Sequence, residues 1–218
     1  MSGTIHLLNT YSKKKFTNTS FYHSPHLPKK HNHVEIRFND LKLVYNDPRR
    51  FGYIDLTNQD PETHKFLSSL GPEPLSNYFN ADNLAETLLN KNKPIKNTLL
   101  DQNIVSGLGN IYVCEALFRS KINPKKNCSK LVTSKGKPRK NLILLVEKIN
   151  EVIKEAIEAG GSSLRDFSNT SGKMGYFQSS FNVYNRENEK CLLDSCDGVV
   201  KRIIQSGRST FFCSRCQK

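Results

Sequence analysis

Four of the six cysteines in this 218-residue sequence form a close group near its C-terminus. Cys191 and Cys196 are separated by four residues, Cys213 and Cys216 by two, and sixteen residues lie between the pairs. Zn²⁺ takes four thiolates in a tetrahedron, and a short C-x₂₋₄-C segment supplies two of them from one tight turn. The spacing therefore predicts one structural zinc held by these four cysteines, with no position left open for a substrate.

The residues between the two cysteine pairs have the pattern of a β-hairpin. A β-like run covers residues 199–204, Gly207 is placed to make the turn, and residues 210–212 form the returning strand. No signal peptide is recognisable at the start of the sequence, so we expect reduced thiols that bind metal. The alternative is four unrelated thiols. Of the other two cysteines, Cys114 is expected to pack on a helix and Cys128 to lie at the surface.

The charge balance favours a polyanionic partner. Lys and Arg total 33 against 20 Asp and Glu, which gives a formal net charge of +13 and a pI near 9.5. A basic surface that is merely solvated is the alternative. No apolar run approaches the roughly 20 residues of a membrane span, so we expect no membrane partner.

Local patterns predict a β-rich start followed by helices. Strands are expected over residues 33–38, 41–45, 52–56 and 181–184. Helices are expected around residues 84–89, from Pro94 to Leu100, from Ile111 to Ser120 with Asn110 as N-cap, and along the apolar positions between 142 and 156. Gly160 and Gly161 would end the last helix, and residues 121–140 form a basic loop.

Seven short strings then occur in one order along the chain. They are MSG at 1–3, DPRRFG at 47–52, LGPEPL at 70–75, GLGNIY at 107–112, GGSSLRDF at 160–167, GKMGYF at 172–177 and QSGRSTF at 205–211. Together they resemble the formamidopyrimidine-DNA glycosylases, bacterial enzymes that remove oxidised purines. The resemblance covers essentially the whole chain, and the second and sixth strings favour this branch of the wider family over the endonuclease VIII branch.

The resemblance implies an α+β fold in three parts. A partial N-terminal β-sandwich lobe would cover residues 1–68, a helix–two-turn–helix DNA-binding domain residues 69–180, and a four-cysteine zinc-finger hairpin residues 181–218. It also implies a monomer that works in the bacterial cytoplasm on the nucleoid. The partner would be duplex DNA containing an oxidised purine or an abasic site.

The resemblance assigns roles to individual residues. Arg208 would bind phosphates beside the lesion and assist the final elimination, and Asn110 would contact DNA as well as cap its helix. A flipped base leaves a hole in the stack that must be filled. Arg49, Phe51 and Met1 match the three residues that fill it. The alternatives are a surface arginine at 208, a cap alone at 110, and an ordinary ion pair and a core position at 49 and 51.

Four further residues match DNA contacts of the family. His31 and Lys91 would contact the DNA backbone, and Lys173 and Tyr176 belong to a loop over the flipped base. Each of them would otherwise be an ordinary solvated side chain.

The catalytic start of the family has no counterpart in this sequence. The proline whose amine attacks C1′, the glutamate beside it and an assisting lysine would all fall upstream of Met1. Either the true start lies upstream, or the chain is a truncation that binds damaged DNA without efficient excision. An in-frame Pro-Glu-Leu-Pro-Glu-like sequence upstream of the Met1 codon would decide between them.

The leading hypothesis is a glycosylase with AP-lyase activity. By resemblance it excises 8-oxoguanine and formamidopyrimidines through a Schiff base and then cleaves the strand by β,δ-elimination. A damaged-DNA-binding module without catalysis is the second hypothesis. A zinc-ribbon protein that binds RNA or ribosomes is the third, although it leaves Arg49, Phe51 and Asn110 unexplained.

The charge analysis gives a first test. We expect the affinity of the protein for duplex DNA to fall steeply with salt, because each neutralised phosphate releases counterions. Binding isotherms at increasing salt measure this slope. A flat dependence, or equal affinity for undamaged DNA and structured RNA, would contradict a damage-specific DNA-binding function.

Overall fold

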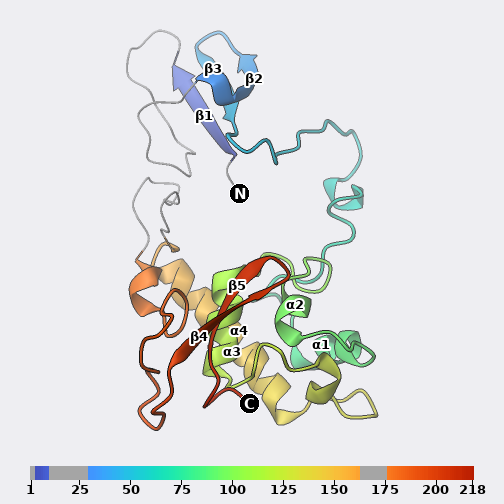
Figure 1. The fold of residues 1–218 in the computed structure, drawn as a ribbon. Coiled ribbons are helices and arrows are strands. Elements are labelled where there is room, and N and C mark those ends of the chain that lie inside the picture. Colours follow the sequence, from blue (N-terminus) through green and yellow to red (C-terminus); the bar gives the residue numbers. More distant parts are fainter. Residues whose placement is uncertain (1–2, 10–28, 163–175) are drawn as a thin grey trace. The chain divides into compact units, whose positions relative to one another are not determined.

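The computed structural model describes residues 3–9, 29–162 and 176–218. The chain divides into two compact units: residues 1–58 with 156–180, and residues 59–155 with 181–218 (Figure 1). The first unit contains a small sheet and the second contains most of the helices and a β-hairpin. The fold therefore mixes helices and strands, as the sequence predicted. None of the described helices is both long and apolar enough to cross a membrane.

The sheet of the first unit has three antiparallel strands in the order β1-β3-β2. β1 is Thr4–Asn9, β2 is Asn32–Arg37 and β3 is Leu41–Asn46. A 3-10 turn, η1 (Lys29–His31), precedes β2. The strands predicted at 33–38 and 41–45 are confirmed, each displaced by one residue at most at either end. β1 was not predicted, because residues 4–9 lack a regular apolar alternation.

The prediction of a strand over residues 52–56 is wrong. These residues form neither helix nor strand and are exposed. A strand persists where a neighbour takes up its backbone hydrogen bonds, and no such neighbour pairs with this segment within the described part of the chain. The alternation of apolar and polar residues at 52–56 is therefore not sufficient to form a strand.

In the second unit, four helices follow a short 3-10 turn, η2 (Pro61–Thr63). α1 (Ala81–Leu88) begins where the Asn80 side chain accepts a hydrogen bond from the backbone N–H of Asn83 at 2.9 Å. α2 (Ile95–Leu99) follows Pro94, and α3 (Asn110–Arg119) follows Gly109. η3 (Cys128–Leu131) lies in the basic loop before α4 (Lys140–Glu158). The four helices predicted from apolar periodicity are present.

The long helix α4 stops where the sequence predicted. Gly160 and Gly161 adopt φ of 72° and 88°, a left-handed conformation that costs glycine little. The N–H of Gly161 bonds the carbonyl of Ala156 at 2.7 Å and so closes the last turn. Earlier in the same helix, Glu155 forms a bidentate ion pair with Arg119 of α3, both N–O distances being 2.7 Å. Arg119 holds the pKa of Glu155 below its usual value.

The β-hairpin consists of β4 (Val200–Gln205) and β5 (Arg208–Cys213), joined by a turn at Ser206 and Gly207. β5 packs against α3 (Figure 1). The two elements share one apolar core, to which α3 contributes Cys114 and Phe118. The finger and the preceding segment complete this core with Val183, Cys191, Val200, Phe211 and Cys213.

Residues 181–184, expected to be a strand, form turns instead. The cause is the buried carboxylate of Glu115 on α3. It accepts hydrogen bonds of 2.8–3.0 Å from the backbone N–H groups of residues 182, 183 and 184, and one from the Asn182 side chain. A side chain thus takes the donors that a neighbouring strand would otherwise use. A further 3-10 turn, η4 (Phe177–Ser180), precedes this segment.

This carboxylate gives a prediction of stability. We expect Glu115→Gln to lower the free energy of unfolding by about 2–4 kcal/mol, because an amide presents one acceptor and places an N–H against other donors. Urea unfolding measures the change, with Glu86→Gln on the exposed side of α1 as the control. Equal stability of the two variants would show that these hydrogen bonds do not hold the segment.

Candidate functional site

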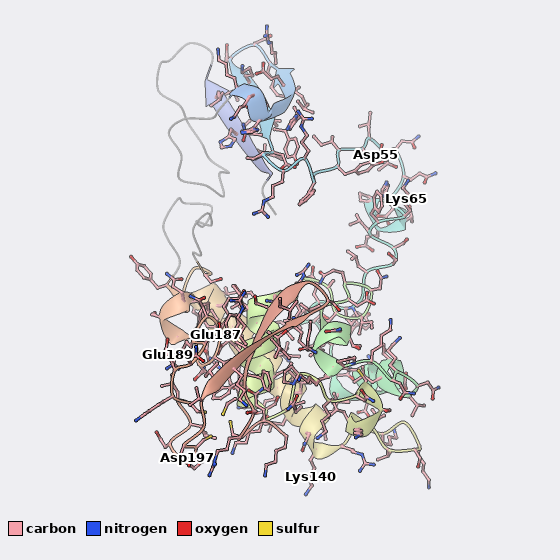
Figure 2. The ribbon with its side chains drawn as sticks, viewed as in Figure 1. Asp55, Lys65, Lys140, Glu187, Glu189 and Asp197 are labelled. Carbon is pink, nitrogen blue, oxygen red and sulfur yellow. The ribbon has the colours of Figure 1, made fainter. Side chains whose placement is uncertain are left out.

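The four C-terminal cysteines come together as the sequence predicted. Their sulfur atoms lie within 4.8 Å of one another, with Cys191 Sγ 3.8 Å from Cys216 Sγ and Cys196 Sγ 3.7 Å from Cys213 Sγ. Four thiolates at about 2.3 Å from a central zinc would be about 3.8 Å apart. Figure 2 shows these sulfur atoms near Asp197, at the end of the finger away from the hairpin turn. The donor set and its spacing fit one structural zinc.

Two neighbouring residues shape the sulfur cluster. A Cβ atom at Gly198 would come 2.6 Å from Cys213 Sγ, so only glycine fits there. The buried Gln217 accepts a hydrogen bond from Cys213 N at 2.8 Å and donates one to the carbonyl of Ile122 at 2.9 Å. The cluster is thereby tied to the segment that follows α3.

Zinc binding is also coupled to protons at this cluster. Burial, followed by the neighbouring thiols of Cys213 and Cys191, raises the pKa of Cys216. Zinc takes the thiolate form, so its binding must displace that proton.

At its other end the hairpin is joined to α3 through Asn110. The Asn110 Nδ2 atom donates to the carbonyl of Ser209 at 2.9 Å and lies 3.5 Å from the hydroxyl of Tyr184. The prediction that Asn110 caps α3 is therefore wrong: Gly109 is the capping residue and Asn110 is the first helical one, with no side-chain cap. Ser209 follows Arg208, so the structure brings Asn110 and Arg208 to one place.

Buried polar atoms gather where the hairpin meets α2 and α3. Within the described part of the chain, five such atoms of this region have no hydrogen-bond partner: Lys96 Nζ, Asn97 Oδ1, Asn110 Oδ1, Gln205 Oε1 and Thr210 Oγ1. The neighbouring Nδ2 atom of Asn97 donates to Ser206 Oγ at 2.8 Å, which places α2 beside the hairpin turn. Unsatisfied buried groups are costly, so this region suits a polar ligand or water.

Lys96 is the residue of this region that sequence analysis missed. Its side chain is fully buried, and burial lowers its pKa, while the Cys114 thiol acts in the opposite direction and Arg208 in the same one. Cys114 itself packs on the apolar face of α3 as expected, and burial raises its pKa to about 11. A lysine between Ile95 and Leu99 in a short helix was the only signal, and it was not distinctive.

The turn before α3 presents backbone toward solvent. Gly107 is exposed with φ of 73°, and its N–H donates to the Gln102 side chain at 2.8 Å. Gly71 packs so closely that an added Cβ would lie 2.5 Å from the backbone of Ile104. These contacts hold the turn that leads into Asn110. Arg208 is exposed at the start of β5, and Lys91 is half-buried after α1.

In the first unit, one buried carboxylate builds the turn that carries Arg49 and Phe51. Asp47 accepts hydrogen bonds from Gly52 N at 2.8 Å, Arg49 N at 3.2 Å and the Tyr45 hydroxyl at 3.0 Å. The turn therefore follows β3 as expected, but no strand follows it. Both predicted contact residues point outward, and Phe51 is 74% exposed, so it is not a core residue.

The remaining predicted contacts divide between described and undescribed residues. His31 is half-buried in η1, and its carbonyl accepts from Asp47 N at 2.9 Å. Tyr176 follows the α4 terminus, where its N–H bonds the carbonyl of Ala159, and is 72% exposed. Met1 and Lys173 lie outside the described residues.

The prediction that Cys128 lies at the surface is wrong. It is fully buried and its sulfur lies 3.1 Å from the Thr98 hydroxyl. The basic residues around it suggested a surface loop, but η3 turns its own apolar side inward against α1 and α2.

Comparison with known proteins identifies related families. The model of the formamidopyrimidine-DNA glycosylase H2TH domain matches residues 70–168, and that of the zinc finger found in FPG and IleRS matches residues 188–218. The formamidopyrimidine-DNA glycosylase of Roseobacter denitrificans is 52% identical over 200 residues, covering 91% of this chain and 69% of the relative. That of Rhodopseudomonas palustris is 49% identical over 220 residues, covering 100% and 74%.

Solved structures give the same result. The complex of the Lactococcus lactis Fpg with an abasic-site-containing DNA has a TM-score of 0.76 and 34% identity, and the match covers 100% of this chain and 72% of that one. A complex of a Lactococcus lactis FPG mutant with a Fapy-dG-containing DNA has a TM-score of 0.77 at the same identity and coverage.

The sulfur cluster gives a prediction about metal removal. We expect Cys213→Ser, or chelation of the wild type, to release the zinc and to lower DNA affinity at least about tenfold. Without the metal, the cysteine end of the hairpin that carries Arg208 is no longer held in place. Zinc content and DNA binding are measured together, with Ser195→Ala between the first two cysteines as the control. Unchanged affinity after complete zinc loss would separate the metal from DNA binding.

Proposed function

Since the chain belongs to the formamidopyrimidine-DNA glycosylase family, we propose that its second unit grips the phosphate backbone beside a lesion through Arg208 and Asn110. The family makes the chain a base-excision-repair DNA glycosylase and AP lyase that acts on oxidised purines. Its partner is duplex DNA, and it carries one structural zinc.

The gathering of unsatisfied polar atoms under the hairpin carries this proposal. Asn110 Oδ1 and Lys96 Nζ are buried with no partner in the described part of the chain, and Arg208 lies beside them at the surface. A guanidinium binds a phosphate through two parallel N–H groups, and the ammonium of Lys96 adds to the positive potential there. The N-terminus of α3, which starts at Asn110, adds its partial positive charge.

Zinc contributes to this function by structure alone. The thiolates of Cys191, Cys196, Cys213 and Cys216 would fill all four coordination positions of the zinc, so no position would be left for substrate. When bound, the metal would fix the cysteine end of β4 and β5, while Asn110 fixes the opposite end through Ser209. Arg208 lies at the turn end of the hairpin, between Ser206, which bonds Asn97, and Ser209, which bonds Asn110. By the family resemblance it would also assist the elimination step.

In the first unit we assign the stack-filling role to Arg49 and Phe51. The Asp47 carboxylate fixes their turn from inside, and Gly52 allows it, since a Cβ at that position would collide with the Tyr45 hydroxyl. An exposed aromatic on a rigid turn is suited to insertion between base pairs. An exposed arginine next to it can face the base left unpaired by flipping.

The other assignments complete the proposal. His31 and Lys91 would contact the DNA backbone, and Met1 would fill the stack together with Arg49 and Phe51. Lys173 and Tyr176 would belong to the loop over the flipped base. The three domains would be residues 1–68, 69–180 and 181–218, in one monomeric chain. Since the relatives are bacterial and the partner is DNA, we place the protein in the bacterial cytoplasm on the nucleoid.

Binding to damaged DNA tests the proposal. We expect Arg208→Ala to weaken binding to an abasic-site duplex by about 10- to 100-fold, the value of a charged phosphate contact of about 1.5–3 kcal/mol. Arg215→Ala is the matched control, because Arg215 lies in the same finger but pairs with Asp197. Asn110→Ala is expected to show an intermediate loss. Equal affinity of the Arg208 and Arg215 variants would refute the role of Arg208.

Borohydride trapping separates the glycosylase from a binding module without catalysis. A covalent adduct with a duplex containing 8-oxoguanine is expected for the enzyme, because a Schiff-base intermediate is reduced in place. Retained discrimination of the abasic-site duplex with no adduct would assign the damage-binding role to this chain.

A further inference from the structure

The segment between α3 and α4 has an extreme charge composition that the proposed function does not use. Residues 121–140 include eight Lys or Arg and no Asp or Glu. None of the residues assigned to lesion binding lies among them. We refer to residues 121–140 as the basic segment.

The basic segment is folded and held in place. Backbone hydrogen bonds join Lys126 O to Ile95 N at 2.8 Å and Cys128 N to Lys93 O at 3.0 Å. Its apolar residues are buried beneath it: Ile122, Cys128, Leu131 and Val132. The charges therefore sit on a fixed surface, unlike those of a solvated tail, and binding an anion there requires little ordering of the backbone.

Most of these cations have no acidic partner. Within the described ranges the structure pairs one of them with an acidic side chain, Lys137 with Asp82 at 3.9 Å, and both side chains are exposed. Such a pair contributes little. Lys126 Nζ donates to the oxygen of Lys218, the last residue, at 3.3 Å. The like charges repel one another, so an arriving polyanion would relieve the repulsion and release its own counterions.

The charges surround a hollow at the start of α4. A cavity of about 530 Å³ is lined by Lys126, Lys130, Pro138, Arg139, Lys140 and Asn141. The first turn of α4 contains no acidic residue. Helix N-termini are partially positive and favour anions, so cations at this position are locally unfavourable. The cations nevertheless lie at the start of α4, where a bound phosphate would offset this unfavourable interaction.

The chemistry of the surface favours nucleic acid over protein. No large exposed hydrophobic residue lies within the basic segment, whereas protein interfaces depend on aromatic, apolar and arginine anchors. Seven of its eight cations are lysines, which act as point charges on phosphates without reading bases. Duplex DNA is already the partner of this protein.

The position of the segment also fits. Pro124 accepts hydrogen bonds from the Gln205 side chain at 3.5 Å and from Lys96 N at 3.4 Å, so the segment begins beside the hairpin that carries Arg208. Lys140, at its far end, lies at the lower edge of this unit in Figure 2. The charges thus begin beside the finger and continue to the start of α4.

We propose that the basic segment is a second, sequence-independent surface for the phosphates of duplex DNA outside the lesion contact. The proposal rests on the DNA partner of the proposed function and adds a separate site to it. It would lengthen the contact with DNA and hold the protein on undamaged duplex between lesions.

A charge-neutralised variant tests this surface. In Lys125→Gln/Lys130→Gln/Lys140→Gln, we expect affinity for an undamaged duplex of about 40 base pairs to fall about tenfold. The slope of log affinity against log salt should become less steep by about 0.9 for each phosphate that the variant no longer neutralises. Affinity for a duplex of about 12 base pairs centred on an abasic site should change far less, because few phosphates lie beyond the lesion contacts.

The control is Lys65→Gln/Lys154→Gln/Lys190→Gln, which removes the same charge from exposed positions elsewhere in this unit. Equal slopes and affinities for the two triple variants overturn the proposal. A larger loss with single-stranded RNA of equal length than with the long duplex overturns the assignment to DNA. Failure of the proposed function is distinct: the wild type would then not prefer the abasic-site duplex. An unfolding temperature equal to that of the wild type would show that both triple variants are folded.

Discussion

The hairpin of the second unit depends on four sulfur atoms at its base. A two-stranded hairpin is marginal in water by itself, and zinc bound by the four cysteines would supply the missing stability. Two of the ligands, Cys191 and Cys213, also belong to the apolar core that the finger shares with α3. Metal site and hydrophobic packing therefore fix the same structure, and every functional assignment to Arg208 follows from its attachment there.

A second constraint acts through the buried carboxylates of Glu115 and Asp47. Each is surrounded by backbone N–H groups that it fixes in one arrangement: residues 182–184 before the finger, and the turn from 47 to 52 in the first unit. A buried carboxylate is tolerated when its oxygens are fully hydrogen-bonded. In both units, irregular backbone that would otherwise be mobile becomes a rigid support for the residues proposed to contact DNA.

The positive charge of the chain is divided between two kinds of surface. Around Arg208 it is combined with polar atoms, a helix N-terminus and the buried Lys96, an arrangement suited to a particular phosphate. On the basic segment it consists mainly of exposed lysines on a folded loop, an arrangement suited to any phosphate. Lesion recognition and general retention on DNA have different requirements, and separate surfaces allow both.

The zinc ligands, the hairpin, the four helices and the glycines that end α4 were predictable from the sequence, because cysteine spacing, apolar periodicity and left-handed glycines act over a few residues. Three features became visible only in the folded chain: residues 181–184 form turns, Asn110 bonds Ser209 and does not cap its helix, and Cys128 and Lys96 are buried. Those outcomes depend on partners far along the chain, such as Glu115 at a separation of 67 residues from Asn182. Local patterns contain no information about hydrogen bonds that form across such distances.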